Sequence, residues 1–132
     1  MKRMLGIYKL VLLSGVKGEE FEKFMSEEIF PAAAEVPGSV NRASQSAIKS
    51  QHLLKAVGDN PEYLWVVKDS GVFDSIAFTR VFERMYEDDR EKLESFATRE
   101  SSTAFEVLDG FQAAARDHVG NEIGKPIHFD DI

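Results

Sequence analysis

Two short segments constrain the fold most, because each is apolar on both of its alternating faces. They are YKLVLLS at 8–14 and YLWVV at 63–67. Neighbouring side chains of a strand point to opposite sides of a sheet, so these segments predict strands that are buried on both faces. A third segment, VPGSVNRASQSAIKSQHLL at 36–54, begins as a sharp turn and continues as a stretch that is polar on both faces. One sheet with apolar central strands and a polar edge strand accommodates all three segments.

Two helices are expected between the strands. Apolar residues recur at steps of three and four over residues 19–36, which is typical of an amphipathic helix. Pro31 cannot donate a backbone hydrogen bond, so this helix should kink or restart there. The expected order is strand, helix, strand, strand, helix, strand, with bounds of about 7–14, 19–36, 39–54, 63–68, 74–98 and 103–108.

This order is the split βαβ arrangement of ferredoxin-like α+β domains, a four-stranded antiparallel sheet with two helices on one face. Strands one and three are then central, and strands two and four form the edges. The sheet face away from the helices would expose the apolar side chains of the central strands, and monomers rarely tolerate such a patch. A second copy of the chain is the simplest cover, so the sequence predicts a homodimer.

Length and charge limit the classes of function. The 132 residues suit one domain, expected at 1–108, followed by an extension at 109–132 that packs on the domain or on the dimer partner. A net charge of −7 opposes binding to nucleic acids and to anionic membranes. Lys9 interrupts the apolar run near the N-terminus, so we expect no membrane span. The absence of cysteine excludes disulfides and is compatible with the cytoplasmic location that we expect.

The layout resembles that of a known superfamily. The phrases that carry the likeness are FPAAAEVPGSV at 30–40, a long second strand, GDNPEYLWVV at 58–67 and a helix that begins near Ser75. Together they resemble the dimeric α+β barrel superfamily, which includes antibiotic-biosynthesis-monooxygenase-like proteins. The resemblance implies that two ferredoxin-like sheets face each other in a homodimer. It also implies a ligand cavity between the sheet and the helices of each subunit.

Five residues are candidates for such a site. His52, near the end of strand two, is the candidate catalytic residue, as a general base or as a group that orients a ligand. Arg42 and Ser44 would bind a carboxylate, enolate or phenolate if they point into a cavity. Trp65 and Tyr8 would line its aromatic wall. The alternatives are a polar strand end for His52, a wet edge for Arg42 and Ser44, and core packing for both aromatic residues.

No cofactor or metal is expected. His118 and His128 lie in the C-terminal extension without a distant partner ligand, so they indicate no metal site. Haem-degrading members of the superfamily place a histidine on the second helix, where this chain has none. The resemblance therefore implies a protein that binds a small organic molecule in a cavity between sheet and helices. The alternative is a cofactor-independent monooxygenase or isomerase that acts on a small aromatic or enolisable substrate.

Overall fold

The fold is an α+β domain whose helices and strands follow the predicted order. A computed structural model describes residues 4–35, 40–41, 45–46, 48–69, 85, 87–108 and 116–124. Its elements are β1 (Met4–Leu12), α1 (Gly18–Phe24), a π-helical segment (Met25–Ile29), α2 (Phe30–Glu35), β2 (Val40–Asn41), β3 (Gln45–Ser46), β4 (Ile48–Lys55), β5 (Glu62–Asp69), α5 (Glu87–Phe96) and β6 (Ala97–Glu106).

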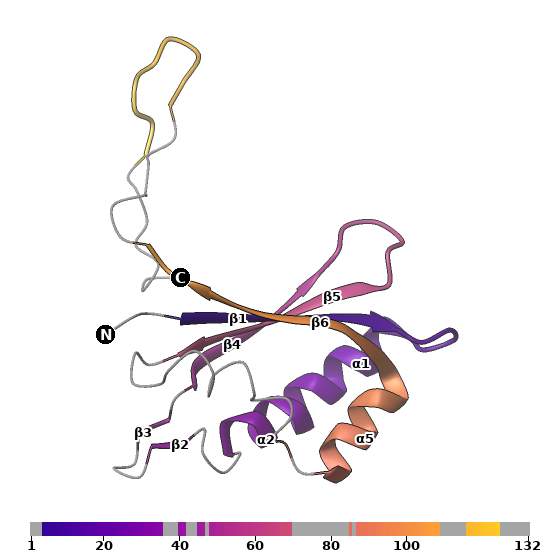
Figure 1. The fold of residues 1–132 in the computed structure, drawn as a ribbon. Helices are drawn as coiled ribbons and strands as arrows, with labels where there is room; N and C mark the ends of the chain where they lie inside the picture. The colour runs from indigo at the N-terminus through magenta and orange to yellow at the C-terminus, as the bar shows by residue number, and fades with distance from the viewer. Residues whose placement is uncertain are drawn as a thin grey trace.

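The sheet confirms the predicted ferredoxin-like topology. Its four antiparallel strands lie in the order β4-β5-β1-β6, so the two apolar strands are central and the polar ones are edges. Figure 1 shows the helices on one side of this sheet, as predicted. The helices cover one face only. Because successive side chains of a strand point to opposite faces, those of β1 and β5 point alternately toward the helices and away from them.

Pro31 disturbs the first helix in a specific way. The backbone N–H of Phe30 donates to Met25 O, five residues back, so the helix is π-helical over Met25–Ile29 before α2 begins. Proline has no N–H, and its ring crowds the carbonyl group one turn earlier, which a widened turn relieves. The expected kink or restart takes the form of this π-helical turn, in which Phe30 keeps a helical backbone, and the helix keeps Met25, Ile29 and Ala33 in the core.

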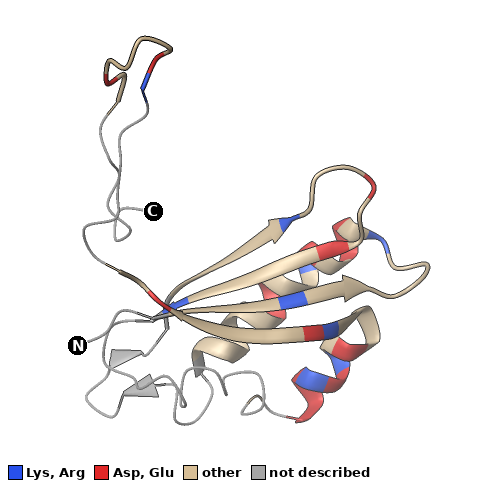
Figure 2. Ribbon diagram, turned by 45° about the horizontal axis from the view of Figure 1, so that its top comes forward, with Lys and Arg blue, Asp and Glu red and all other residues tan. Residues whose placement is uncertain are grey.

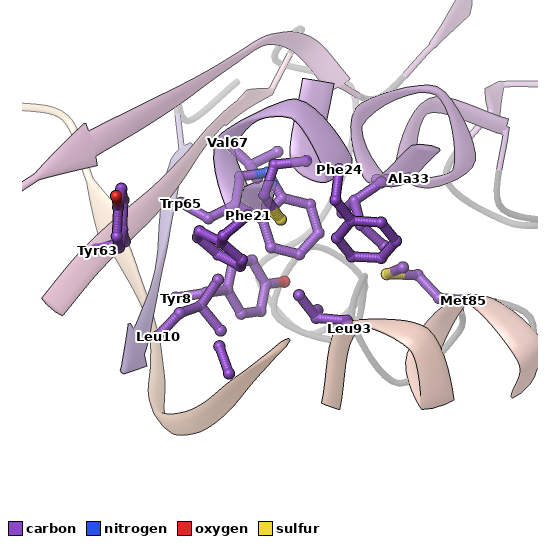
Figure 3. Packing of buried hydrophobic residues seen from close by; sticks show 13 residues of the cluster. Tyr8, Leu10, Phe21, Phe24, Ala33, Tyr63, Trp65, Val67, Met85 and Leu93 are labelled. Carbon is purple, nitrogen blue, oxygen red and sulfur yellow. The ribbon is translucent and has the colours of Figure 1, made fainter. Parts of the chain in front are cut away.

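The hydrophobic core lies between the sheet and the helices. Strands β1 and β5 contribute Tyr8, Leu10, Tyr63, Trp65 and Val67, and the helices contribute Phe21, Phe24, Met25, Ile29, Ala33 and Leu93. Figure 3 shows these side chains interdigitating, with Tyr63 at the margin of the cluster. The rings of Tyr8 and Trp65 are 4.8 Å apart, and those of Phe24 and Phe96 stack at 4.5 Å.

The edge strands differ from their predicted bounds. Strand β6 begins at Ala97, not at Thr103, because it pairs with β1 from Ala97↔Leu12 onward. The predicted polar strand is divided: β2 and β3 form a separate two-stranded hairpin, and β4 starts at Ile48 and runs on to Lys55. Of the predicted second helix, only Glu87–Phe96 and Met85 lie within the described residues.

The face of the sheet opposite the helices carries apolar side chains together with polar ones such as His52 and Lys68. It carries Leu5, Ile7 and Val11 of β1, Leu54 of β4, Leu64 and Val66 of β5, and Phe105 of β6. We call this side of the sheet the open face. Leu54 and Phe105 are 51% and 49% exposed. At its centre the Lys9 ammonium lies 3.3 Å from both Glu62 and Glu100. Figure 2 shows separate charged positions on the strands and a dense run of charged residues on α5.

A nine-residue hairpin at 116–124 stands apart from the sheet in Figure 1. Arg116 and Glu122 pair as an isolated bridge and also through their side chains at 3.3 Å. The carboxylate of Asp117 accepts hydrogen bonds from the N–H groups of Val119 and Asn121. The hairpin thus holds its own turn together while it exposes Val119 and Ile123.

Candidate functional site

A pocket lies at the end of the sheet, on the side of the helices. Its volume is about 260 Å³, and its walls come from the end of β1, the start of α1, the end of β4 and the β4–β5 loop. The lining residues are Leu12, Gly18, Lys55, Gly58, Asp59, Asn60, Pro61 and Tyr63. This is slightly smaller than the roughly 300–1,000 Å³ of typical drug-sized sites, so the pocket suits a fragment-sized molecule.

The inner wall depends on Gly18. A Cβ atom at this position would lie 2.8 Å from the Tyr63 hydroxyl and 3.3 Å from Glu22 Oε2. Tyr63 is buried at the margin of the core, and its hydroxyl donates a 2.6 Å hydrogen bond to Glu22 Oε2. Because Gly18 has no side chain, the tyrosine and the carboxylate can meet at this point.

This contact keeps the Tyr63 hydroxyl protonated. Burial, the hydrogen bond to Glu22 and the charge of Glu22 together raise the pKa of Tyr63 to about 12. The hydroxyl therefore stays protonated at neutral pH and remains a donor to the carboxylate. Tyr63 is then unsuited to act as a general base, and its role is to hold Glu22 in place.

The outer wall carries positively and negatively charged side chains. The Lys55 ammonium lies 3.8 Å from the position that a Gly18 Cβ would occupy. Asp59 and Asn60 follow in the loop, whose turn needs a positive φ of 88° at Gly58. Asn60 Oδ1 accepts a hydrogen bond from the N–H of Glu62 at 3.0 Å, which orients its amide. The lining therefore offers an ammonium, a carboxylate and an amide.

The aromatic candidates from the sequence lie elsewhere. Tyr8 and Trp65 are 1% and 0% exposed and pack on each other in the core. Trp65 Nε1 donates to Gln51 Oε1 at 2.9 Å, so its polar atom is satisfied inside the protein. Neither residue lines the pocket described above.

His52 lies on the opposite side of the sheet from Trp65. It pairs with Val66 in the register of β4 and β5, which places it on the open face. Its Nε2 lies 3.4 Å from the hydroxyl of Ser50, a long contact between two half-buried side chains. Arg42 and Ser44 lie outside the described residues.

None of four residues around this pocket was predicted as a site residue: Gly18, Glu22, Lys55 and Tyr63. They come from three separate segments, and none belongs to a recognisable motif. Strand register brings Lys55 opposite Tyr63, and the helix then brings Glu22 to the tyrosine hydroxyl. The available signal was a glycine at the start of a helix, which on its own is common.

Two further observations apply to the described ranges. No group of three histidine, aspartate or glutamate side chains there is arranged to bind a metal ion. Among the helices of those ranges, none is both long enough and apolar enough to cross a bilayer.

Comparison with known proteins supports the fold. No family model matches the chain, and no curated protein matches it. Among solved structures, it is similar to the crystal structure of HapK from Hahella chejuensis, with a TM-score of 0.52 and 18% sequence identity. The match covers 85% of this chain and 99% of that chain. At this identity the similarity extends to the small α+β fold and not to function.

Proposed function

We propose that the protein is a homodimer that binds a small organic molecule between the sheet and the helices of each subunit. The architecture would be that of the dimeric α+β barrels, as in antibiotic-biosynthesis-monooxygenase-like proteins, whose layout the sequence resembles. The pocket beside Gly18 is the observation that carries the ligand-binding proposal. It combines a concave shape with polar lining residues, Lys55, Asp59 and Asn60, beside the apolar Leu12 and Pro61, and small-molecule sites usually combine both kinds of residue.

The open face supports the dimer. Seven apolar residues lie on this face over four strands, interspersed with Lys9, His52 and Lys68, and large apolar surfaces usually mark an interface. Lys9 at the centre has two carboxylate partners within its own subunit, so a second sheet could cover it without a counter-charge. The hairpin at 116–124 lies beyond the end of β6, and we propose that this extension packs against the domain or the partner.

Light scattering coupled to size-exclusion chromatography tests the dimer. Val66→Lys places a charge in the open face and should convert the dimer to a monomer, because an unpaired charge in an apolar interface is strongly unfavourable. Glu91→Lys, on the exposed surface of α5, is the control and should leave the dimer intact. A wild-type chain that elutes as a monomer at all concentrations contradicts the proposal.

Ligand-observed NMR with a library of small polar fragments tests the pocket. Asp59→Trp should block the site, since Asp59 is an exposed lining residue and the indole would fill the opening. Val57→Trp is the matched control, because Val57 is 99% exposed in the same loop and lies outside the pocket lining. Hits that survive Asp59→Trp place the binding site elsewhere.

A catalytic version of this function would use His52. The His52 and Ser50 pair faces the open side of the sheet, which a face-to-face dimer would enclose. There the imidazole could take a proton from an enolisable or phenolic substrate as an oxygenation or isomerisation begins. Arg42 and Ser44 remain proposed ligand-binding residues for this version. Tyr8 and Trp65 face the helices on the other side of the sheet, so as proposed ligand-binding residues they belong to a site on that side. His52→Gln should abolish turnover of such a substrate and leave the dimer unchanged, whereas unaltered turnover would exclude His52 as the base.

A further inference from the structure

Arg90 of α5 carries a buried hydrogen-bond donor that the protein does not satisfy. The Nε atom of its guanidinium group is shielded from solvent, and no oxygen of the described residues accepts its hydrogen. Within those ranges it is the one buried side-chain nitrogen or oxygen without a partner. A buried donor without an acceptor lowers the stability of a folded protein, so such groups are rare and often have a functional role.

The place of Arg90 on the helix directs this donor toward the interior. It lies one turn before Leu93, which is 1% exposed, at the border of the helix face that packs on the core. The residue as a whole is half-buried, so part of its guanidinium group still reaches solvent. Figure 1 shows α5 on the helix side of the sheet, and a second copy on the open face would therefore not cover Arg90.

Two carboxylates of the same helix are spaced to pair with Arg90 and do not. Glu87 precedes it by three residues and Glu94 follows it by four, the spacings at which opposite charges meet on a helix surface. Both glutamates are exposed, and within the described part of the chain no ion pair joins Arg90 to either of them. The buried Nε atom is therefore turned away from the solvated acids, whose repulsion of an anion at Arg90 is screened by water and salt.

We propose that Arg90 binds the carboxylate group of a small organic anion beside α5. A guanidinium group is planar and always charged, and it can donate two parallel hydrogen bonds to the two oxygens of a carboxylate. No hydrogen bond to a described residue holds the Arg90 guanidinium, so it can turn its Nε–H toward a carboxylate that approaches from the solvent side. Arg90 does not line the pocket beside Gly18, so this site is separate from that pocket and does not depend on it.

The Nε–H signal of Arg90 in a proton–nitrogen correlation NMR spectrum tests the site directly. Benzoate is the probe, and benzamide is its neutral analogue of nearly the same shape. Benzoate should move this signal downfield as a hydrogen bond forms, and it should bind about tenfold more tightly than benzamide, because hydrogen bonds between charged groups are the stronger ones. Inorganic phosphate brings more negative charge to the acidic first turn of α5 and should bind more weakly than benzoate.

Arg90→Met shows whether the arginine serves the fold or a ligand. Methionine keeps an unbranched side chain and needs no acceptor, so the urea midpoint of the ligand-free protein should stay the same or rise. Benzoate affinity should at the same time fall to the level of benzamide. Arg90→Lys keeps the charge without the planar fork and should retain only part of the preference. Arg116→Met removes the same charge from the hairpin at 116–124 and should leave benzoate binding unchanged.

Any of four results would overturn the inference. A lower urea midpoint of ligand-free Arg90→Met would show that the guanidinium has a partner within the folded chain. Unchanged benzoate affinity in that variant would place the anion elsewhere, and tighter binding of phosphate than of benzoate would exclude the carboxylate class. Loss of benzoate binding in Asp59→Trp would assign the anion to Lys55 in the pocket beside Gly18. In that case the proposed ligand-binding function stands and the Arg90 site is wrong.

Discussion

Trp65 and Gln51 are joined by a hydrogen bond of 2.9 Å from the indole Nε1 to the side-chain carbonyl Oε1. The Nε2 of the same glutamine donates to the backbone oxygen of Phe30 at 2.8 Å. One amide group therefore links an edge strand, a central strand and the first helix where its π-helical segment ends. The buried indole has its hydrogen bond only because β4 presents a polar residue to the core.

Gln51→Leu should destabilise the domain by about 2 kcal/mol, because it leaves the buried indole N–H without an acceptor. Urea denaturation followed by fluorescence measures this loss, and Trp65 is the single tryptophan of the chain. Ser50→Ala, one residue earlier and directed to the open face, is the control and should cost less than about 0.5 kcal/mol. Equal stability of Gln51→Leu and the wild type would show that the indole finds another partner.

Gly18→Ala should destabilise the protein by about 1–2 kcal/mol, since the added methyl group would meet the rigid Tyr63 hydroxyl at 2.8 Å. The same substitution in a Tyr63→Phe background should be neutral or slightly stabilising, because the clashing oxygen is gone and alanine favours helix. A double-mutant cycle of unfolding free energies measures the coupling. Additive effects would mean that the clash is relieved by movement elsewhere.

The raised pKa of Tyr63 predicts a loss of stability in alkaline solution. Since the pKa is about 12 in the folded state and about 10 in an unfolded chain, folding favours the protonated form. The stabilisation is complete below pH 10 and is lost as the pH rises through 12. Denaturation curves between pH 9 and 12 measure it, and Tyr63→Phe should flatten this part of the profile. Glu22→Gln should lower the tyrosine pKa only in part, because burial is the largest cause.

The C-terminal hairpin should respond to acid. Hydrogen bonds from the backbone of Asn121 and Val119 lower the pKa of Asp117 below the usual 3.8. A carboxylate with a lowered pKa stabilises the folded form at higher pH, so the hairpin should loosen as the pH falls from about 4 through the lowered value. Amide chemical shifts of Val119 and Asn121 follow the change. Asp117→Asn keeps an acceptor oxygen and should remove the pH dependence, and a hairpin that stays intact at pH 2 would contradict this account.

The central part of the fold could be predicted from the sequence because its signals are local. YKLVLLS and YLWVV are apolar on both faces, and this alone places β1 and β5 in the middle of the sheet. Strand β1 is nevertheless shifted to Met4–Leu12 from the expected 7–14. Pairing with two neighbours recruits residues that have no strand pattern of their own.

The start of β6 could not be predicted for a related reason. ATRESST at 97–103 is mostly exposed on an edge strand, so its side chains do not alternate between apolar and polar. Its extended conformation comes from hydrogen bonds to β1, which are invisible in a linear pattern. The pocket could not be predicted for the same reason. Lys55, Tyr63 and Glu22 come together only when strand register and helix packing are set.

The π-helical segment Met25–Ile29 also affects how this chain can change in length. A π turn holds one residue more than an α-helix needs for the same advance, so the surplus is stored at one place. Removing one residue from this turn and replacing Pro31 would let the helix close in regular α register. Phe21 on one side and Ala33 on the other would still face the sheet. Relatives of this protein can therefore differ by one residue here and keep the same buried surface.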